Sequence, residues 1–175
     1  MKKRVGSKGF SLVELIIVIA IMAILVGIMA PQLIKYLEKA KVGSDTQMLN
    51  AVYAAVVYAT VDKDVLDDPN AKAIIDSMVA APIKLEDIMT PSGNRLEETV
   101  KSSLGWSTLS QTYYETLLKS THTSDSEIWI QYKGSSVNPI AMWITYTDET
   151  GKKQVAGQVP TDYLDLQNFD CISIR

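Results

Sequence analysis

An apolar run near the start of the chain constrains its fold more than any other feature. Residues 10–30, FSLVELIIVIAIMAILVGIMA, contain only two polar side chains, Ser11 and Glu14. As a helix that rises 1.5 Å per residue, the run is about 31 Å long, roughly the hydrocarbon thickness of a bilayer. We therefore predict a transmembrane helix.

The distribution of charge predicts how this helix is oriented. Four basic residues (Lys2, Lys3, Arg4 and Lys8) precede the run and leave 13 basic against 20 acidic residues in the rest of the chain, a net charge of −7. Basic flanks stay on the cytoplasmic side, so we expect residues 1–9 in the cytoplasm and the acidic body outside. Such a body is not expected to bind nucleic acid in general, because phosphate recognition needs concentrated Lys and Arg.

A secretory signal peptide is the alternative interpretation of a basic start followed by an apolar run. The run is longer than the roughly 7 to 15 apolar residues of such a peptide, and Glu14 interrupts it. The helical pattern also continues beyond the point where a signal peptide would be cut. These three features favour a helix that belongs to the folded protein.

Beyond residue 30 the pattern becomes that of an amphipathic helix. Apolar side chains recur at spacings of three and four residues, at Leu33, Ile34, Leu37, Met48, Leu49, Val52, Tyr53, Val56 and Val57. We predict one helix from Phe10 to Val61, with residues 31–61 packed on a folded body. Pro31 lacks an amide hydrogen and follows Gly27 by four residues, which predicts a kink rather than an end. Close helix packing in a membrane is the alternative role for Gly27.

The segment KGFSLVELIIVIAIMAILVGIMAPQLIKYLEKAK resembles the start of type IV pilins and their pseudopilin relatives. The resemblance covers about the first fifty residues. It implies that prepilin peptidase, a membrane aspartyl peptidase, cuts between Gly9 and Phe10 and methylates the new amino terminus. Residues 1–9 are then a leader peptide, and Phe10 opens the mature protein.

Glu14 is the unusual residue of the apolar run. A carboxylate in hydrocarbon costs about 2 to 3 kcal/mol on insertion scales, and such groups usually have a partner. The α-amine of Phe10 lies one turn away and is the predicted partner, either within one subunit or from a neighbour whose axial position it would fix. The alternative is an interfacial carboxylate near its own helix N-terminus, where negative charge is favoured.

The rest of the chain predicts an α+β body of the pilin fold. Residues 62–126 form a connecting region with short helices at 66–80, 96–104 and 110–119. Residues 127–175 form an antiparallel sheet and a C-terminal loop, because the hydrophobic period changes to two. We expect strands at 127–133, 140–147 and 154–159, with a short edge strand at 171–174. One face of this sheet of three to four strands should cover the helix stripe from Met48 to Val57.

No pattern in the sequence indicates catalysis or a cofactor. His122 has no neighbouring Cys and is expected in a solvated loop. Calcium ligation by Asp162, Asp165 and Asp170 is a weak possibility, because their spacing lacks the alternating ligands and glycine of a calcium loop. We interpret the three tryptophans as core or subunit-contact residues, namely Trp106, Trp129 and Trp143. No phosphate-binding glycine loop is present.

Cys171 is the single cysteine, so an intramolecular disulfide is impossible. Many pilins close this end of the chain with a disulfide. Since this chain cannot form that disulfide within itself, the resemblance implies a C-terminal tail held by packing, as in pilins of Gram-positive bacteria.

The resemblance implies a filament subunit, and the large connecting region, residues 62–126, favours a major pilin, the structural subunit of a type IV pilus for adhesion, motility or DNA uptake, since major pseudopilins tend to be compact. The alternatives are a pseudopilin of a secretion or competence machine, and a minor pilin that acts as an adhesin. Expected partners are identical subunits, prepilin peptidase, and the pilus assembly platform with its ATPase. We expect a single-pass protein of the cell membrane that later moves into an extracellular filament.

Overall fold

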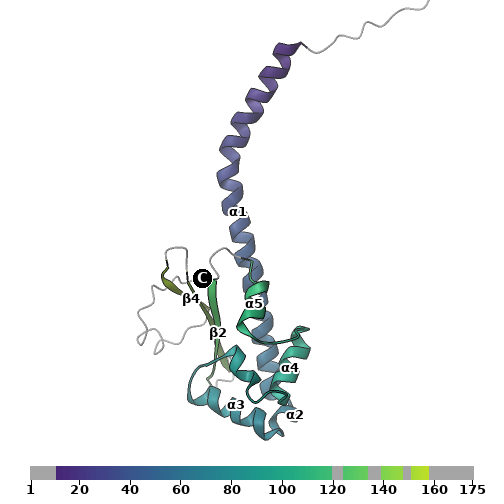
Figure 1. Ribbon diagram of the computed structural model, residues 1–175, viewed down its shortest axis with the longest axis vertical. Helices are drawn as coiled ribbons and strands as arrows, with labels where there is room; N and C mark the ends of the chain where they lie inside the picture. The colour runs from purple at the N-terminus through teal and green to yellow at the C-terminus, as the bar shows by residue number, and fades with distance from the viewer. Residues whose placement is uncertain (1–10, 120–123, 134–138, 148–150, 158–175) are drawn as a thin grey trace, which may run out of the picture. The chain divides into compact units, whose positions relative to one another are not determined.

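The computed structural model describes residues 11–119, 124–133, 139–147 and 151–157. The chain divides into two units, residues 1–40 and residues 41–175, which are considered separately. We refer to residues 41–175 as the body. One helix, α1 (Leu12–Val61), begins in the first unit and ends in the second (Figure 1). This confirms the predicted long helix from Leu12 onwards, while Phe10 lies outside the described residues.

The first unit consists, as far as it is described, of the apolar part of α1. Every side chain from Ser11 to Leu37 is exposed. The helix is long and apolar enough to cross a membrane, and none of its most apolar window is buried. The helix also continues through Pro31, so this proline does not end it. The kink predicted there remains a prediction.

The connecting region is helical, as predicted. Its elements are α2 (Lys63–Leu66), α3 (Pro69–Ala80), the 3-10 helix η1 (Leu85–Met89), α4 (Arg95–Leu104) and α5 (Gln111–Leu117). The predicted helices 66–80, 96–104 and 110–119 correspond to α3, α4 and α5. The helices α2 and η1 were not predicted, because such short helices carry too little periodicity to be recognised in a sequence.

Capping residues define the ends of these helices. The Asp68 side chain accepts a hydrogen bond from the Asn70 N–H, and Pro69 occupies the first turn of α3, where its missing N–H costs nothing. At the C-terminal end of α4, Gly105 has φ = 66° and ends the helix in the left-handed conformation, which favours glycine. The predicted ends at residues 80 and 104 therefore agree with α3 and α4, whereas α3 begins three residues later than predicted.

The sheet has four antiparallel strands in the order β1-β2-β3-β4. They are β1 (Ile83–Lys84), β2 (Ser124–Tyr132), β3 (Ile140–Thr147) and β4 (Lys153–Gly157). The first strand was not predicted: it is a two-residue segment of the connecting region that pairs with Trp129 and Ile130 of β2. The predicted edge strand 171–174 lies outside the described residues.

The bounds of the other strands differ little from the prediction. β2 begins three residues earlier than expected, and its register with β3 shifts between Ser124 and Glu127. Hydrophobic alternation cannot predict such an irregularity, because an extra residue interrupts the period of two. β4 spans 153–157 instead of 154–159, and residues 158–159 are not described.

The core of the body confirms the predicted packing of helix on sheet. Val52 and Val56 of α1 are fully buried and share one cluster with Ile128 and Ile130 of β2. Met48, Leu49, Tyr53 and Val57 are partly buried against the same cluster. Each aliphatic side chain buried in this way stabilises the fold by about 1.5–3 kcal/mol. The fold is therefore α+β, with a helix packed on an antiparallel sheet.

The tryptophans pack largely inside the body. Trp143 is only 1% exposed and forms a second, smaller cluster with Ala141, Val155 and the partly buried Trp129. Trp106 packs against the main core and makes an edge contact with Tyr113 at a centroid distance of 5.7 Å. These positions agree with the predicted role as core residues.

Candidate processing and assembly site

The first turn of α1 holds Glu14 through a local hydrogen bond. The Ser11 backbone N–H donates to Glu14 Oε2 at 2.9 Å, and Leu15 N–H donates to the Ser11 carbonyl at 3.3 Å. The carboxylate therefore reaches back over the helix start and satisfies one of the amide hydrogens that have no partner within the helix. Negative charge is also favoured at this end of a helix dipole.

This arrangement is half of a capping box, in which Ser or Thr is followed three residues later by Glu. Ser11-Leu12-Val13-Glu14 has this spacing, so the sequence contains the signal for this cap. The prediction included only the favourable position of the carboxylate at the helix N-terminus. The predicted alternative for Glu14, a carboxylate at its own helix N-terminus, thus describes its position in a single chain. A partnership with an amine would be a further interaction, because a carboxylate has two oxygens.

Several predicted site residues lie outside the described part of the chain. They are Gly9 and Phe10 of the processing site, and His122, Asp162, Asp165, Asp170 and Cys171. Cleavage, methylation and the Phe10 amine as partner of Glu14 therefore remain predictions. Among the residues that are described, no group of three or more His, Cys, Asp or Glu could hold a metal ion.

Gly27 and Pro31 lie four residues apart within α1, so the proline stands where an N–H would normally donate to the glycine carbonyl. Proline has no N–H to donate to the carbonyl four residues earlier, which here belongs to Gly27, and its ring crowds that carbonyl. A Cβ built on Gly27 would meet no other atom within 4 Å. No described neighbour therefore requires glycine at this position, so either backbone adjustment next to Pro31 or a contact with another molecule would account for it.

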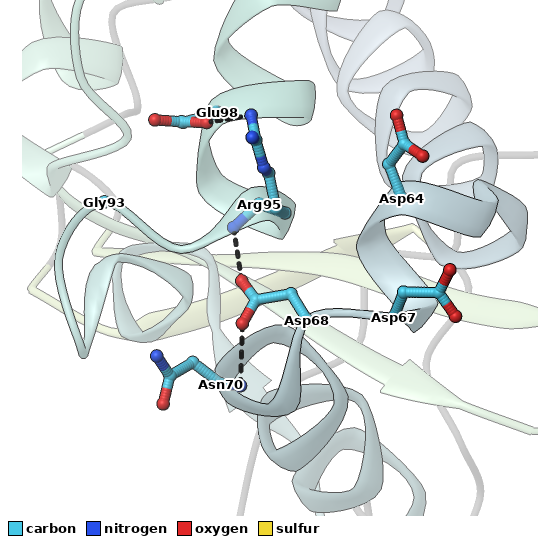
Figure 2. A pocket seen from close by; sticks show the side chains of 7 residues that line it. All are labelled: Asp64, Asp67, Asp68, Asn70, Gly93, Arg95 and Glu98. Atoms are coloured by element: carbon cyan, nitrogen blue, oxygen red, sulfur yellow. Dashed lines mark hydrogen bonds and ion pairs between the residues drawn. The ribbon is translucent and has the colours of Figure 1, made fainter.

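The body carries an open acidic cleft that the sequence did not reveal. Its lining comes from α2, the start of α3, and the turn that leads into α4, at Asp64, Asp67, Asp68, Asn70, Gly93, Arg95 and Glu98 (Figure 2). We call this the acidic cleft. The lining carries four carboxylates and one guanidinium, and Arg95 Nη1 pairs with Glu98 Oε2 at 3.0 Å. No other Lys or Arg is on this lining.

Asp68 connects the two sides of the acidic cleft. Its carboxylate accepts hydrogen bonds from the Arg95 N–H at 2.8 Å and the Asn70 N–H at 3.0 Å (Figure 2). These two bonds, that from Arg95 foremost, lower the pKa of Asp68 because they stabilise the ionised form. The residue thus joins the start of α3 to the start of α4 and keeps its negative charge at neutral pH.

A buried network fixes the beginning of α4. The Asn94 side chain accepts from the Glu97 N–H at 2.8 Å, and the Glu97 carboxylate accepts from the Gly93 N–H at 2.6 Å and from Lys101 Nζ at 2.8 Å. Burial by itself would raise the pKa of Glu97, but the hydrogen bonds from Lys101 and Gly93 outweigh it and lower that pKa. This network stabilises the beginning of α4 within the body.

Comparison with known families identifies the start of the chain. A family model described as the prokaryotic N-terminal methylation motif matches residues 4–30. The chain carries a type IV pilin-like signal. The match spans the predicted cleavage point between Gly9 and Phe10, the carboxylate of Glu14 and the whole apolar run. Neither curated proteins nor solved structures gave a match.

The methylation motif supports a type IV pilin-like or pseudopilin protein. It implies processing by prepilin peptidase and pilus-type assembly, and together with the apolar helix it indicates membrane anchoring before assembly. The motif ends at residue 30, so the body is described by its structure alone.

Proposed function

We propose that this protein is the major structural subunit of a type IV pilus. The leader is removed between Gly9 and Phe10, Phe10 is methylated, and the mature chain polymerises through α1 into a surface filament. The proposal assigns the chain no catalytic role. Adhesion, motility or DNA uptake are activities of such a filament, and the assembly platform and its ATPase would supply the work of extension.

The observation that carries this proposal is the exposure of α1 from Leu12 to Leu37. These apolar side chains include Leu12 at 74% and Ile34 at 67% exposed, and water is an unfavourable environment for all of them. Lipid can cover the run while the chain is anchored, and other copies of the same helix can cover it after extraction. A head-to-tail contact of this kind does not close on itself and therefore gives a filament.

The basic leader supports the proposal that α1 leaves the membrane when the filament assembles. Removal of residues 1–9 takes away four basic residues that would hold the amino terminus at the cytoplasmic face. Glu14 then remains as the charged side chain of the run. Its hydrogen bond to the Ser11 N–H at 2.9 Å lowers the cost of carrying a carboxylate in lipid until assembly provides a second partner.

A pseudopilin shares every feature of α1, and the body favours a pilus. Four α-helices, a 3-10 helix and a sheet strand lie in the region from Lys63 to Leu117. A connecting region of this size favours a pilus, because the major pseudopilins of this family tend to be compact. The distinction is therefore one of abundance and length, which can be measured.

Electron microscopy and mass spectrometry of sheared surface material test the proposal. We expect long fibres composed mainly of this chain, with an amino-terminal peptide that begins at N-methylated Phe10. Gly9→Leu is the matched control, because a bulky residue before the cut should block processing and remove the fibres. Only trace amounts of the chain among the fibres would refute the major-pilin assignment and favour a pseudopilin or minor pilin, whereas intact Met1 in assembled fibres would refute the processing step.

A further inference from the structure

The sheet of the body is buried on both of its faces. Side chains of neighbouring residues on a strand point to opposite faces, so Ile128 of β2 lies in the main core and Trp129 lies on the other side. On that side Trp129 packs against the second cluster, which consists of Ala141, Trp143 and Val155. We call this side of the sheet the Trp143 face.

Burial on the Trp143 face is deepest towards β4. Trp143 of β3 is 1% exposed, and Val155 is 2% exposed although it belongs to β4, the last strand of the described sheet. On the other side of β3, Trp129 is only partly buried and the side chain of Glu127 is 24% exposed. A strand at the edge has a neighbour on one side only, so its side chains are normally more open than those of an inner strand. The low exposure of Val155 therefore indicates a cover on the β4 side.

The described residues of the second cluster do not form this cover themselves. All of them come from strands β2, β3 and β4 and stand side by side on one sheet. Such neighbours shield the flanks of an indole ring and leave its outward side open, because side chains stand roughly perpendicular to a sheet. The buried apolar residues of the described helices belong to the main core on the other face. The cover therefore comes from outside the described part of the chain.

Residues 158–175 begin where the cover is needed. β4 ends at Gly157, and Gly157 is the register partner of Trp143, so the following residue leaves the sheet at the level of this tryptophan. Four strands about 4.8 Å apart give a sheet roughly 15 Å wide. A segment of this length, at about 3.3 Å per extended residue, can cross that width more than once.

The composition of residues 158–175 also suits an apolar surface. Leu164 and Leu166 are two residues apart, as are Ile172 and Ile174, and Phe169 lies between the two pairs. In an extended chain, residues two apart place their side chains on the same side. The segment can therefore present several apolar side chains to one surface.

The other segments of the body outside the described residues are less suitable. Residues 120–123, 134–138 and 148–150 are STHT, GSSVN and DET, in which Val137 is the single large apolar residue. The last two segments join β3 to its neighbours and so start at the ends of this strand, at least about 10 Å from Trp143 at 3.3 Å per residue. This comparison leaves residues 158–175 as the occupant that the chain itself offers.

We propose that residues 158–175 pack across the Trp143 face of the same chain and that the apolar side chains between Leu164 and Ile174 cover Trp143 and Val155. The ion pair of Lys84 Nζ with Glu127 Oε1, at 2.5 Å, is the polar border at which the cover ends. The inference goes beyond the proposed function, because it concerns the body alone and holds whether or not the chain forms a pilus.

Tryptophan fluorescence of the full chain in detergent tests this contact. With Trp106→Phe and Trp129→Phe, Trp143 is the only tryptophan and reports on the Trp143 face. In this background we combine three substitutions of apolar residues: Leu164→Ser, Leu166→Ser and Phe169→Ser. We expect acrylamide to quench Trp143 at least about threefold more strongly, with emission at longer wavelength, because water then reaches the large apolar ring. Unchanged quenching of Trp143 would overturn the proposal.

Two controls separate loss of the contact from loss of the fold. The first replaces polar residues of the same stretch: Asp165→Ser, Gln167→Ser and Asn168→Ser. The second keeps Trp106 as the only tryptophan, since Trp106 packs against the main core. Stronger quenching of Trp143 with the apolar substitutions alone, and unchanged quenching of Trp106, supports the contact. Equal quenching of Trp143 in the apolar and polar variants overturns it.

A nitroxide label on Cys171 tests the contact in the unsubstituted segment and decides the matter if the apolar variant unfolds. Cys171 is the only cysteine, so the label has one position. We expect the label to reduce Trp143 emission by at least about twofold relative to a diamagnetic analogue and to leave Trp106 unchanged, because quenching needs close approach to the ring. Equal emission of Trp143 with both labels overturns the contact. Protection of Trp143 in fibres but not in the monomer also overturns it, since a second copy would then be the cover.

Discussion

The two units of this protein differ in the exposure of their apolar side chains. Ile19 in the apolar run is 58% exposed, whereas Ile130 in the sheet is fully buried. The body buries its apolar residues by folding on itself, from Val52 on α1 to Ile144 on β3. The start of α1 has no such cover among the described residues; lipid, or other copies in the proposed filament, would provide it. One unit is a folded domain, and the other is a contact surface.

Glu14 provides the largest expected effect. Glu14→Ala should leave the body folded but reduce fibre yield by at least about tenfold, which corresponds to about 1.4 kcal/mol per subunit contact. Glu14→Gln sharpens the interpretation, because it keeps an oxygen for the Ser11 N–H and removes the charge. We expect Gln to fail as Ala does. Normal fibres from the Gln variant would show that helix capping is the role of this residue. Fibre yield and N-terminal mass spectrometry provide the readouts.

Matched truncations of isoleucine test the comparison directly. Ile130→Ala should destabilise the detergent-solubilised monomer by about 2–5 kcal/mol, because it opens a cavity in a buried cluster. Ile19→Ala should leave the thermal unfolding of the body unchanged and act only on assembly. Differential scanning calorimetry of the monomer and fibre yield measure the two effects. A stability loss of similar size in both variants would contradict the division into a folded body and a contact surface.

The Glu97 network predicts how the body responds to acid. The pKa of Glu97 lies below its ordinary value of 4.5, so the network stabilises the fold above pH 4.5 and loses this effect as pH falls through the lowered pKa. Glu97→Gln should lower the free energy of unfolding by about 1–3 kcal/mol at neutral pH. It should also weaken the fall of this free energy as the pH becomes acidic. Glu98→Gln is the control, because Glu98 pairs with Arg95 on the surface. The side chains of Arg95 and Glu98 are 63% and 51% exposed, so this ion pair contributes little to the free energy of unfolding. Unfolding of both variants by denaturant between pH 3 and 7 measures these effects. If the stability of Glu97→Gln depends on acid pH as that of the unchanged protein does, this role of Glu97 is wrong.

Glycine substitutions in α1 give the smallest effect. Gly27 and Gly43 both lie inside the helix, and a Cβ at either position meets no described atom within 4 Å. Alanine at either position should therefore favour the helix by about 1 kcal/mol in the monomer. If Gly27 contacts another helix in the fibre, Gly27→Ala will lower fibre yield and Gly43→Ala will not. Circular dichroism and fibre yield are the measurements, and equal yields would remove a packing role for Gly27.

The sequence predicted the elements that are specified locally. The apolar run, the spacing of Val52 and Val56, the Asp68-Pro69 signal of α3 and the alternation in β2 each act through near neighbours along the chain. The Ser11–Glu14 capping geometry was also local and was predicted only in part. β1 was missed for a different reason, because its pairing is not local. β1 is two residues long and exists because β2 provides hydrogen-bonding partners 45 or more residues away.

The sequence by itself determined what the first unit is: a signal, a membrane-length helix and one carboxylate placed a turn from the predicted new amino terminus. Periodicity and charge suffice for this, because a helix satisfies its own backbone and needs no distant partner. Only the tertiary structure decided the body's surface. An apolar groove combines α1 with residues 103–106, and the acidic cleft combines Asp64 with Glu98. Such surfaces depend on long-range packing, which no local pattern specifies.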